Sequence, residues 1–420
     1  MVKIRSFTAH LCNTDNLKEL LSPPYDVLNT EEAREMAKGN PKSFLHCNKP
    51  EIDLPEDCHP YDMKVYEKGR DNLQQFIADK LIVKDDAKRM YVYQMTMKDH
   101  TQKALVGLAN NKDYEEKRIK KHEYTLAAKE EDRTKLINIQ NASLEPVFLT
   151  FRDNQEAIYE MIEAVSQREC HADCTTDDNV RHVLWRCTEE ESAKFVEEFE
   201  KIPALYVADG HHRTAASYNV GKIREQEAKD AGKEITGEEP FNYFMTLFFP
   251  AKVLKIYDYN RVLKDLNGHT SEQFMEKLSE HFELSPLPEG ETTYPSSRHK
   301  FTLHIDGKWW YMNLKESSLN TSTPITQLDS QILTDLVFDP ICNIKDLKKD
   351  PRIDFVGGIR GHKELERRCQ KDCKAAIAMY PCSMEEVMDV ADADMIMPPK
   401  STWFEPKPRS GLIMRCFEDM

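Results

Sequence analysis

A carboxylate, a glycine, two histidines and an arginine follow a short apolar run near the middle of the chain. The segment LYVADGHHRTAAS, residues 205–217, predicts a strand that turns at Asp209-Gly210 into a helix of about residues 211–228. The first helical turn offers free backbone N–H groups and the positive end of the helix dipole, which suits an anion. Side-chain donors at the same corner come from His211, His212, Arg213 and Thr214. The corner predicts a phosphate site, and the alternative is that Asp209 merely caps the helix.

A second dense block of charge lies upstream, at residues 114–136. It reads YEEKRIKKHEYTLAAKEEDRTKL, in which Lys121 precedes His122-Glu123-Tyr124-Thr125. A solvated helix with i,i+4 charge pairs is the alternative reading, and it fits the second half of the block well. Phosphoryl transfer needs a carboxylate to orient or deprotonate a hydroxyl and cations to neutralise the moving group. The two corners together supply both, and a carboxylate such as Asp209 can also hold Mg²⁺ against phosphate oxygens.

Composition limits the classes of function. The chain has 420 residues, a formal net charge of -15, 40% hydrophobic residues and 31% charged residues. This length predicts two or three domains, and the acidic balance argues against general binding to nucleic acid. No apolar run is long enough to span a membrane, and the first residues lack the apolar core of a secretory signal. Eleven scattered cysteines favour a reducing compartment, so we expect a cytoplasmic protein with no nucleic-acid or membrane partner. The sequence indicates no oligomeric state.

Strand-like and helix-like segments alternate in the first part of the chain. Strands are predicted at MYVYQMTM, KALVGLA, PVFLTF, HVLWRC and FNYFMTLFFP, with helices at about 61–80, 158–166 and 189–201. The last of these strands shows little alternation, which indicates burial on both faces. The pattern favours a mixed α/β or α+β core.

A second unit is predicted from near Leu266. It contains a helix at 271–281, a hairpin made of KFTLHID and KWWYMNL, and a helix at 329–337. We therefore expect a core at residues 1–264 and a C-terminal α+β domain at residues 265–420, whose tail straps back toward the active site. The tail contributes three candidate phosphate donors: Lys400, Ser401 and Thr402.

Standard nucleotide loops are absent. The sequence contains neither G-x-x-x-x-G-K-[ST] nor G-x-G-x-x-G. The motifs SPPYDV, KKHEYT with KEEDRTKL, ADGHHRTAAS, the FFP strand and MPPKSTWFEPK instead resemble the free serine kinases of the ParB/sulfiredoxin-like superfamily, in particular a long branch that uses inorganic pyrophosphate. The resemblance extends from Pro23 to Arg409. It implies a ParB/sulfiredoxin-like catalytic core with an N-terminal extension and an additional C-terminal α+β domain.

The resemblance also implies a reaction and roles. The substrates would be L-serine and pyrophosphate, the product O-phosphoserine for cysteine or serine metabolism, and the cofactor Mg²⁺ at Asp209. Asp209 and Glu123 would be catalytic, with Glu123 as general base and Glu130 and Asp26 as rivals for that role. Phosphate would be bound by Gly210, His211, His212, Arg213, Thr214 and Lys121. Serine would be contacted by Tyr25, Asp26, His122, Thr125 and Arg133.

Alternatives stay open at this point. The donor could be ADP or ATP, because related enzymes that use them also lack a P-loop. ParB relatives bind a nucleotide and DNA, although the acidic balance and the lack of a basic recognition helix count against DNA binding. A sulfiredoxin-like thiol repair enzyme would need a cysteine at the phosphate corner, and residues 209–213 contain none.

Overall fold

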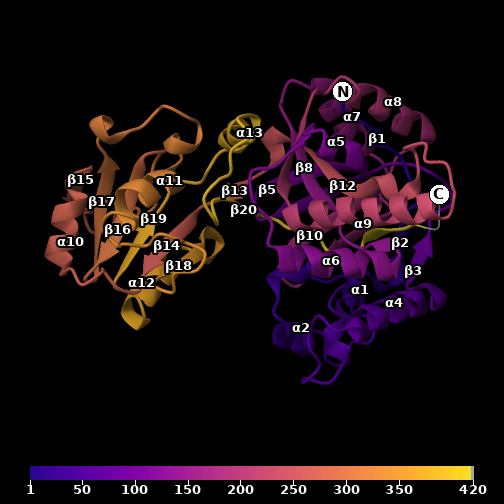
Figure 1. Ribbon diagram of the computed structural model, residues 1–420, viewed down its shortest axis with the longest axis horizontal. Helices are drawn as coiled ribbons and strands as arrows, with labels where there is room; N and C mark the ends of the chain where they lie inside the picture. The colour runs from indigo at the N-terminus through magenta and orange to yellow at the C-terminus, as the bar shows by residue number, and fades with distance from the viewer. Residues whose placement is uncertain (418–420) are drawn as a thin grey trace. The chain divides into compact units, whose positions relative to one another are not determined.

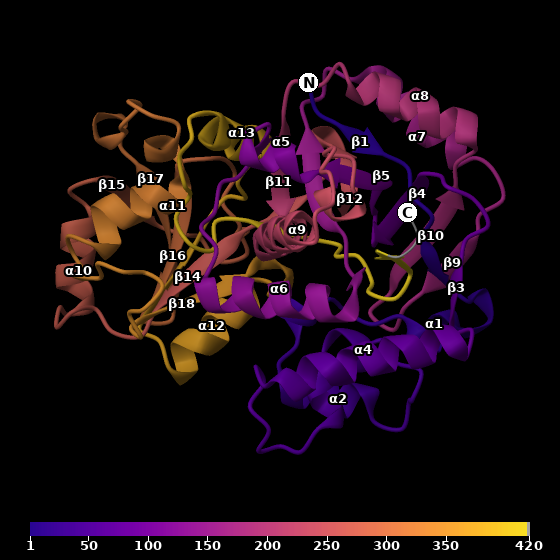
Figure 2. The same ribbon diagram turned by 45° about the vertical axis from the view of Figure 1, so that its right-hand side comes forward.

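The computed structural model describes residues 1–417, which divide into two compact units. Unit 1 combines residues 1–254 with the tail from Pro406, and unit 2 comprises Lys255–Glu405. Both units combine sheets with helices, so the expected mixed α+β class is confirmed (Figures 1 and 2).

Unit 1 is built on a nine-stranded sheet. Its strand order is β6-β11-β8-β12-β5-β4-β10-β9, with β1 pairing β5 outside this path. Neighbours are antiparallel except for two parallel pairs, β11 with β6 and β12 with β8. In the order of the sheet, the strands are β6 (Ile119–Lys120), β11 (Leu205–Asp209), β8 (Val147–Phe151), β12 (Tyr243–Pro250), β5 (His100–Asn110), β4 (Tyr91–Met97), β10 (Val180–Arg186), β9 (Ala172–Thr175) and, beside β5, β1 (Ile4–Arg5).

The central strand β12 is buried along its whole length, as its unbroken apolar sequence predicted. Helices cover both faces of the sheet. Phe195 and Phe199 of α8 and Ile158 of α7 pack with alternate strand residues on one face, while α9 contacts β8 and β12. In Figure 1, α7 and α8 lie on the other side of the sheet from α9 and α6. The helices of unit 1 are α1 (Leu17–Leu20), α2 (Thr30–Ala37), α3 (Leu45–Asn48), α4 (Met63–Ala78), α5 (Asn111–Glu115), α6 (Ala127–Gln140), α7 (Glu156–Val165), α8 (Glu189–Phe199) and α9 (His211–Asp230).

The C-terminal tail completes a second, four-stranded sheet in unit 1. Its order is β3-β2-β21-β7, formed by β3 (Ile82–Lys84), β2 (His10–Cys12), β21 (Ile413–Cys416) and β7 (Ala142–Ser143). The guanidinium of Arg415 in β21 is buried and donates hydrogen bonds to the backbone carbonyls of Tyr243 and Pro240. The tail is therefore an ordered part of unit 1 from Pro406 to Phe417.

Unit 2 has a six-stranded antiparallel sheet with the order β15-β17-β16-β19-β14-β18. The strands are β15 (Phe282–Pro286), β17 (Lys308–Leu314), β16 (Lys300–Ile305), β19 (Ala375–Ala378), β14 (Tyr259–Leu263) and β18 (Ile353–Gly357), and a separate pair joins β13 (Ile256–Tyr257) to β20 (Trp403–Phe404). The boundary expected at residue 264 differs from the structure, because β14 pairs with β18 and β19 and so belongs to the second unit. The expected extent to residue 420 also differs, because the tail from Pro406 belongs to unit 1.

Four α-helices accompany this sheet: α10 (Ser271–Leu278), α11 (Asp329–Leu333), α12 (His362–Lys371) and α13 (Met384–Asp392). The helix expected at 329–337 changes character after Leu333 and continues as a π-helical turn, Thr334–Phe338. No helix within residues 1–417 has the length and apolar character needed to cross a membrane.

Candidate functional site

The corner between β11 and α9 depends on Gly210. This residue adopts φ 90° and ψ 34°, the left-handed region that favours glycine, and α9 begins at the next residue. A Cβ at this position would lie 3.1 Å from Nε of Arg213. Gly210 is the N-cap, and no side chain caps this end of the helix. Asp209 precedes the N-cap, so the alternative in which Asp209 merely caps the helix is wrong.

Asp209 is held by two cations instead. Its Oδ2 lies 3.1 Å from Nη2 of Arg213, and its Oδ1 lies 3.4 Å from Nζ of Lys407, while a quarter of the side chain is exposed. Burial alone would raise the pKa of this carboxyl, but the charges of Lys407 and Arg213, with His211, outweigh burial and lower the pKa. Asp209 is thus an ionised carboxylate at the positive end of a 20-residue helix.

Arg213 is buried and fixed from several sides. Its Nη1 donates to the carbonyl of Pro146 at 2.8 Å and lies 3.7 Å from Oε2 of Glu145. Burial lowers the pKa of the guanidinium, but the negative charges of Glu145, Asp26 and Asp209 raise it by more. The net effect is a raised pKa, so the group stays charged. A buried charge that keeps its proton is a fixed counter-ion for a negatively charged ligand.

Glu145 joins three distant segments beneath this arginine. Its Oε1 accepts hydrogen bonds from the backbone N of Tyr25 at 3.1 Å, from Nδ2 of Asn48 at 2.9 Å and from Oγ of Ser410 at 2.5 Å. The side chain is buried. Glu145 therefore ties the SPPYDV segment and the tail to the corner.

Two neutral histidine rings pack beside Asp209. The rings of His122 and His211 meet edge to face, with centroids 4.5 Å apart. Burial lowers the pKa of His122 to about 4, although the Val207 backbone and Asp209 oppose the shift, and burial with the neighbouring His122 lowers the pKa of His211. The Nε2 of His211 is buried and meets no hydrogen-bond partner within residues 1–417. Neutral imidazoles here act as hydrogen-bonding groups and not as fixed charges.

The second charged block meets the first because β6 and β11 are parallel neighbours. Leu205 pairs with Ile119 and Tyr206 with Lys120, so the segments that follow the two strands leave the sheet at the same edge. His122 is buried there, and Oε2 of Glu123 lies 3.8 Å from Nδ1 of His211 with 42% of the Glu123 side chain exposed. The structure thus brings Asp209, His211, His122 and Glu123 together.

The rivals for the role of base have different surroundings. Glu130 accepts hydrogen bonds from Oγ1 of Thr125 at 2.6 Å and from Nδ2 of Asn219 at 2.7 Å. These bonds anchor the HEYT segment to α6 and α9. Asp26, in the 3-10 turn η2 (Tyr25–Val27), is exposed but raises the pKa of Arg213. Both carboxylate oxygens of Glu130 therefore accept hydrogen bonds within unit 1. Asp26 stays a rival to Glu123 for the role of general base.

Arg133 and His212, which were expected to bind the substrate and the phosphate, contact other residues of unit 1. Arg133 lies 4.1 Å over the ring of Tyr25 and 2.7 Å from Oδ2 of Asp132. Nε2 of His212 accepts a hydrogen bond from the backbone N of Leu126 at 3.0 Å.

Two of the expected phosphate binders, Thr214 and Lys121, have different surroundings. Thr214 is fully buried, and its hydroxyl donates to the carbonyl of Gly210 at 3.1 Å. Thr214 is therefore corrected from a phosphate binder to a helix-internal residue. Lys121 is exposed, and its Nζ lies 5.8 Å from the ring centre of Tyr114. After burial and His122, its charge is among the causes that lower the pKa of His211, and its expected role as a phosphate binder stays a prediction.

The three tail residues Lys400, Ser401 and Thr402 belong to unit 2. The carbonyl of Lys400 accepts a hydrogen bond from Arg261 at 2.8 Å, and Oγ of Ser401 lies 2.9 Å from Oγ of Ser330. Their expected role as phosphate donors stays a prediction.

Two residues of the corner were missed from the sequence. Lys407 lies in the proline-rich stretch FEPKPRS, whose basic charge was a weak signal, and Glu145 precedes a proline without any surrounding pattern. Within residues 1–417 no group of three or more His, Cys, Asp or Glu side chains has the arrangement of a metal site. Any cation at Asp209 would therefore depend on oxygen atoms from a ligand or from water.

Comparison with known proteins gives a family. No curated protein matches the chain. Among solved structures, a free serine kinase in complex with AMP is similar at 13% identity and a TM-score of 0.34, over 71% of this chain and 86% of that one. C-terminally truncated SbnI from Staphylococcus aureus shows 12% identity and a TM-score of 0.37, over 72% and 84% of the two chains.

Likenesses with TM-scores this low do not establish a common fold. The family model matches residues 4–331, and the chain therefore belongs to DUF1015, a family described as proteins of unknown function.

Proposed function

We propose that the chain is a phosphotransferase that moves a phosphoryl group from inorganic pyrophosphate to the hydroxyl of free L-serine. One observation carries the proposal. An ionised carboxylate, Asp209, stands at the uncapped N-terminus of α9 with the cationic groups of Arg213 and Lys407 at 3.1 and 3.4 Å. Helix N–H groups and fixed cations stabilise the negative charge that phosphoryl transfer spreads over phosphate oxygens.

The residues of the corner divide the work in this proposal. Arg213 and Lys407 neutralise the phosphoryl donor, and the unpartnered Nε2 of His211 offers a further hydrogen bond. Glu123 takes the proton of the serine hydroxyl as the Oγ–P bond forms and the P–O bond to the leaving phosphate breaks. Both carboxylates interact with His211: Oε2 of Glu123 lies 3.8 Å from its Nδ1, and the charge of Asp209 acts on the same ring. The products are O-phosphoserine and inorganic phosphate.

Mg²⁺ fits this corner in a limited way. Asp209 offers one carboxylate, and magnesium commonly uses one or two carboxylates together with substrate phosphates and water. Asp209 would have to share that carboxylate with Arg213 and Lys407. When bound, Mg²⁺ would neutralise phosphate charge.

A donor screen tests the proposal. The full chain is incubated with L-serine, Mg²⁺ and pyrophosphate, ADP or ATP in separate reactions, and O-phosphoserine is measured by mass spectrometry. We expect product with pyrophosphate in the wild type and none with Asp209→Asn. If O-phosphoserine forms with ADP or ATP but not with pyrophosphate, the proposed donor is wrong and the proposed serine kinase activity stands. No O-phosphoserine with any donor would show that the chain is not a serine kinase.

A further inference from the structure

Lys407 and Arg213 hold Asp209 in different ways. Nη1 of Arg213 donates to the carbonyl of Pro146 at 2.8 Å and lies 3.7 Å from Oε2 of Glu145, and only 6% of the Arg213 side chain is exposed. Lys407 has 17% of its side chain exposed, and its ammonium ends a flexible four-carbon stem. Arg213 therefore cannot leave the carboxylate without breaking buried contacts, whereas Lys407 can move by rotation about its side-chain bonds.

The backbone on either side of Lys407 is anchored in unit 1. Lys407 lies between two prolines, whose rings restrict the backbone. The carbonyl of Pro406 accepts a hydrogen bond from Nε2 of Gln102 at 2.9 Å, and the backbone N of Arg409 donates to the hydroxyl of Tyr93 at 3.1 Å. Gln102 and Tyr93 are both buried. These contacts fix the point from which the Lys407 side chain starts and keep its ammonium within one side-chain length of the corner.

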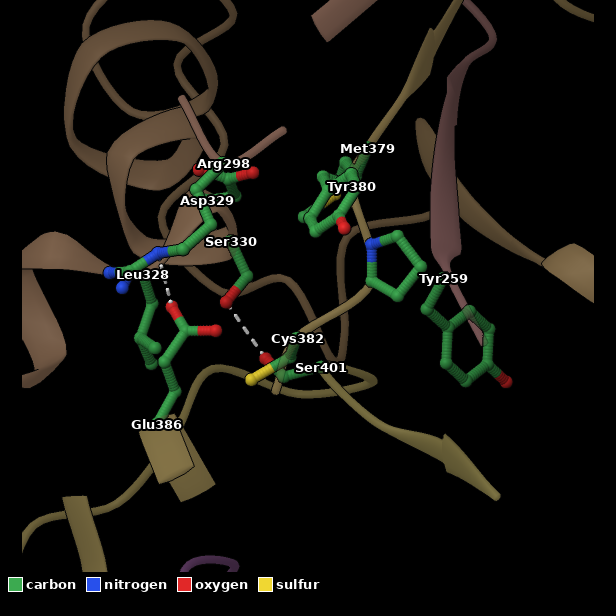
Figure 3. A pocket seen from close by; sticks show the side chains of 11 residues that line it. Tyr259, Arg298, Leu328, Asp329, Ser330, Met379, Tyr380, Cys382, Glu386 and Ser401 are labelled. Atoms are coloured by element: carbon green, nitrogen blue, oxygen red, sulfur yellow. Dashed lines mark hydrogen bonds and ion pairs between the residues drawn. The ribbon is translucent and has the colours of Figure 1, made fainter. Parts of the chain in front are cut away.

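The contacts of Asp209 differ from those of a carboxylate that is held by the backbone. In the small polar cavity of unit 2, Oε1 of Glu386 lies 2.8 Å from Nε of Arg298, and its other oxygen accepts a hydrogen bond from the backbone N of Ser383 at 2.8 Å. Figure 3 shows the pairing of Arg298 with Glu386. At Asp209 both oxygens lie against side-chain cations, and Oδ1 is the one that Lys407 contacts. Movement of Lys407 would therefore release this oxygen.

A divalent cation would compete with the Lys407 ammonium for that oxygen. Oδ1 of Asp209 lies 3.4 Å from Nζ of Lys407, so a metal ion on the same oxygen would be strongly repelled by the ammonium. Within the described residues 1–417, no group of three or more His, Cys, Asp or Glu side chains is arranged for a metal ion. An anionic ligand such as a phosphate group supplies both further oxygen ligands for the metal ion and a second partner for the ammonium.

We propose that Lys407 is an exchangeable counter-ion, which pairs with Oδ1 of Asp209 until substrate binds and then moves to the phosphate group of the donor. A divalent cation takes the carboxylate oxygen that Lys407 has left. Binding of the divalent cation and of the phosphate group is therefore coupled, because each favours the position of Lys407 that the other needs. The inference rests on the proposed function for the phosphate donor and the cation at Asp209, but not on serine or on turnover.

Metal binding to the full chain tests the exchange without any turnover. Mn²⁺ replaces Mg²⁺ as the probe, because the electron paramagnetic resonance signal of free Mn²⁺ falls when the ion binds. Sulfate serves as the phosphate-like anion, since it binds free Mn²⁺ weakly. At constant ionic strength, we expect sulfate to tighten Mn²⁺ binding to the wild type by about 10-fold over chloride. Asp209→Asn should remove most of the Mn²⁺ binding, which would assign the ion to this carboxylate.

Variants of Lys407 distinguish a competing ammonium from a permanent structural charge. Lys407→Met should tighten Mn²⁺ binding without sulfate by about 10-fold, because the competing ammonium is gone, and sulfate should then add little. Lys407→Arg keeps the charge and should bind Mn²⁺ as the wild type does. Lys252→Met, which removes a lysine paired with Glu156 in the same unit, is the matched control for net charge and should also behave as the wild type.

Circular dichroism and unfolding midpoints show whether each variant folds, and Lys407→Gln takes the place of Lys407→Met if the methionine variant does not fold. The sulfate effect on the wild type needs no variant, and its absence would contradict the coupling. Unchanged or weaker Mn²⁺ binding in a folded variant that lacks the Lys407 charge would overturn the exchange. If the Mn²⁺ affinities change as expected but no O-phosphoserine forms with any donor, the exchange stands and only the proposed serine kinase activity is wrong.

Discussion

Lys407 and Asp209 form an ion pair, with Nζ of one 3.4 Å from Oδ1 of the other, although they come from the two separate stretches of chain that build unit 1. The tail thereby supplies a charge to the corner that β11 and α9 form. Lys407 is also the largest of the charges that lower the pKa of Asp209. The order of the tail and the chemistry of the corner are therefore linked.

Removing this charge should weaken the activity more than the fold. We expect Lys407→Met to lower kcat/KM for O-phosphoserine formation by about 10²-fold, because a fixed cation beside the transferred group is lost. Lys407→Arg keeps a charge and should retain most of the activity. Steady-state kinetics of both variants check this, and equal losses in the two would show that the charge is not what matters.

Glu145 should be among the most costly polar side chains of unit 1 to remove. In Glu145→Ala, Arg213 loses a buried counter-ion and the donors of Tyr25, Asn48 and Ser410 lose their acceptor. Breaking a buried charge pair costs about 3–5 kcal/mol. Urea unfolding measures the change, and Glu190→Ala, whose partner Lys194 lies on the same exposed face of α8, should change the midpoint little. A similarly small effect in Glu145→Ala would contradict this role.

The base can be assigned with two variants. Glu123→Gln should lower kcat by about 10²–10⁴-fold without changing stability, since the side chain is 42% exposed. Glu130→Gln should mainly lower the unfolding midpoint, because Glu130 holds Thr125 and Asn219. Near-normal turnover in Glu123→Gln would transfer the role to Asp26, and Asp26→Asn would then be the variant to measure.

Local patterns predicted the elements better than their long-range partners. The apolar run of β12 and the alternation in β4 and β5 predicted those strands, and the Asp-Gly turn predicted the corner. Nothing in the local sequence around Glu145 or Lys407 shows that they meet Arg213 and Asp209. The boundary near residue 264 was misplaced for the same reason, because β14 is assigned to unit 2 only by its pairing with β18 and β19.

Gly210 should be required for its backbone conformation and for space. Gly210→Ala places a β-carbon at φ 90° and 3.1 Å from the guanidinium of Arg213. We expect a loss of about 1–3 kcal/mol in stability together with most of the activity. Gly232→Ala is a matched control, because Gly232 also has a positive φ, 72°, but nothing lies within 4 Å of its added carbon. The Gly232→Ala variant should lose stability and keep its activity. Equal activity in the two variants would show that the site does not need Gly210.

Acid should destabilise unit 1 through the buried histidines. The pKa of His122 is lowered to about 4 by burial, against an ordinary value of 6.5. Between these two values the unfolded chain binds the proton and the folded chain does not, so the free energy of unfolding falls as pH falls through this window. Full protonation would remove about 3 kcal/mol from this residue alone.

Urea unfolding at a series of pH values between about 4 and 7.5 measures this dependence. His122→Gln removes the titrating ring and should flatten the decline at acid pH. His59→Gln, at an exposed position, is the control and should follow the wild type. If His122→Gln loses stability on acidification as steeply as the wild type does, another group, with His211 as the first to test, governs the acid response.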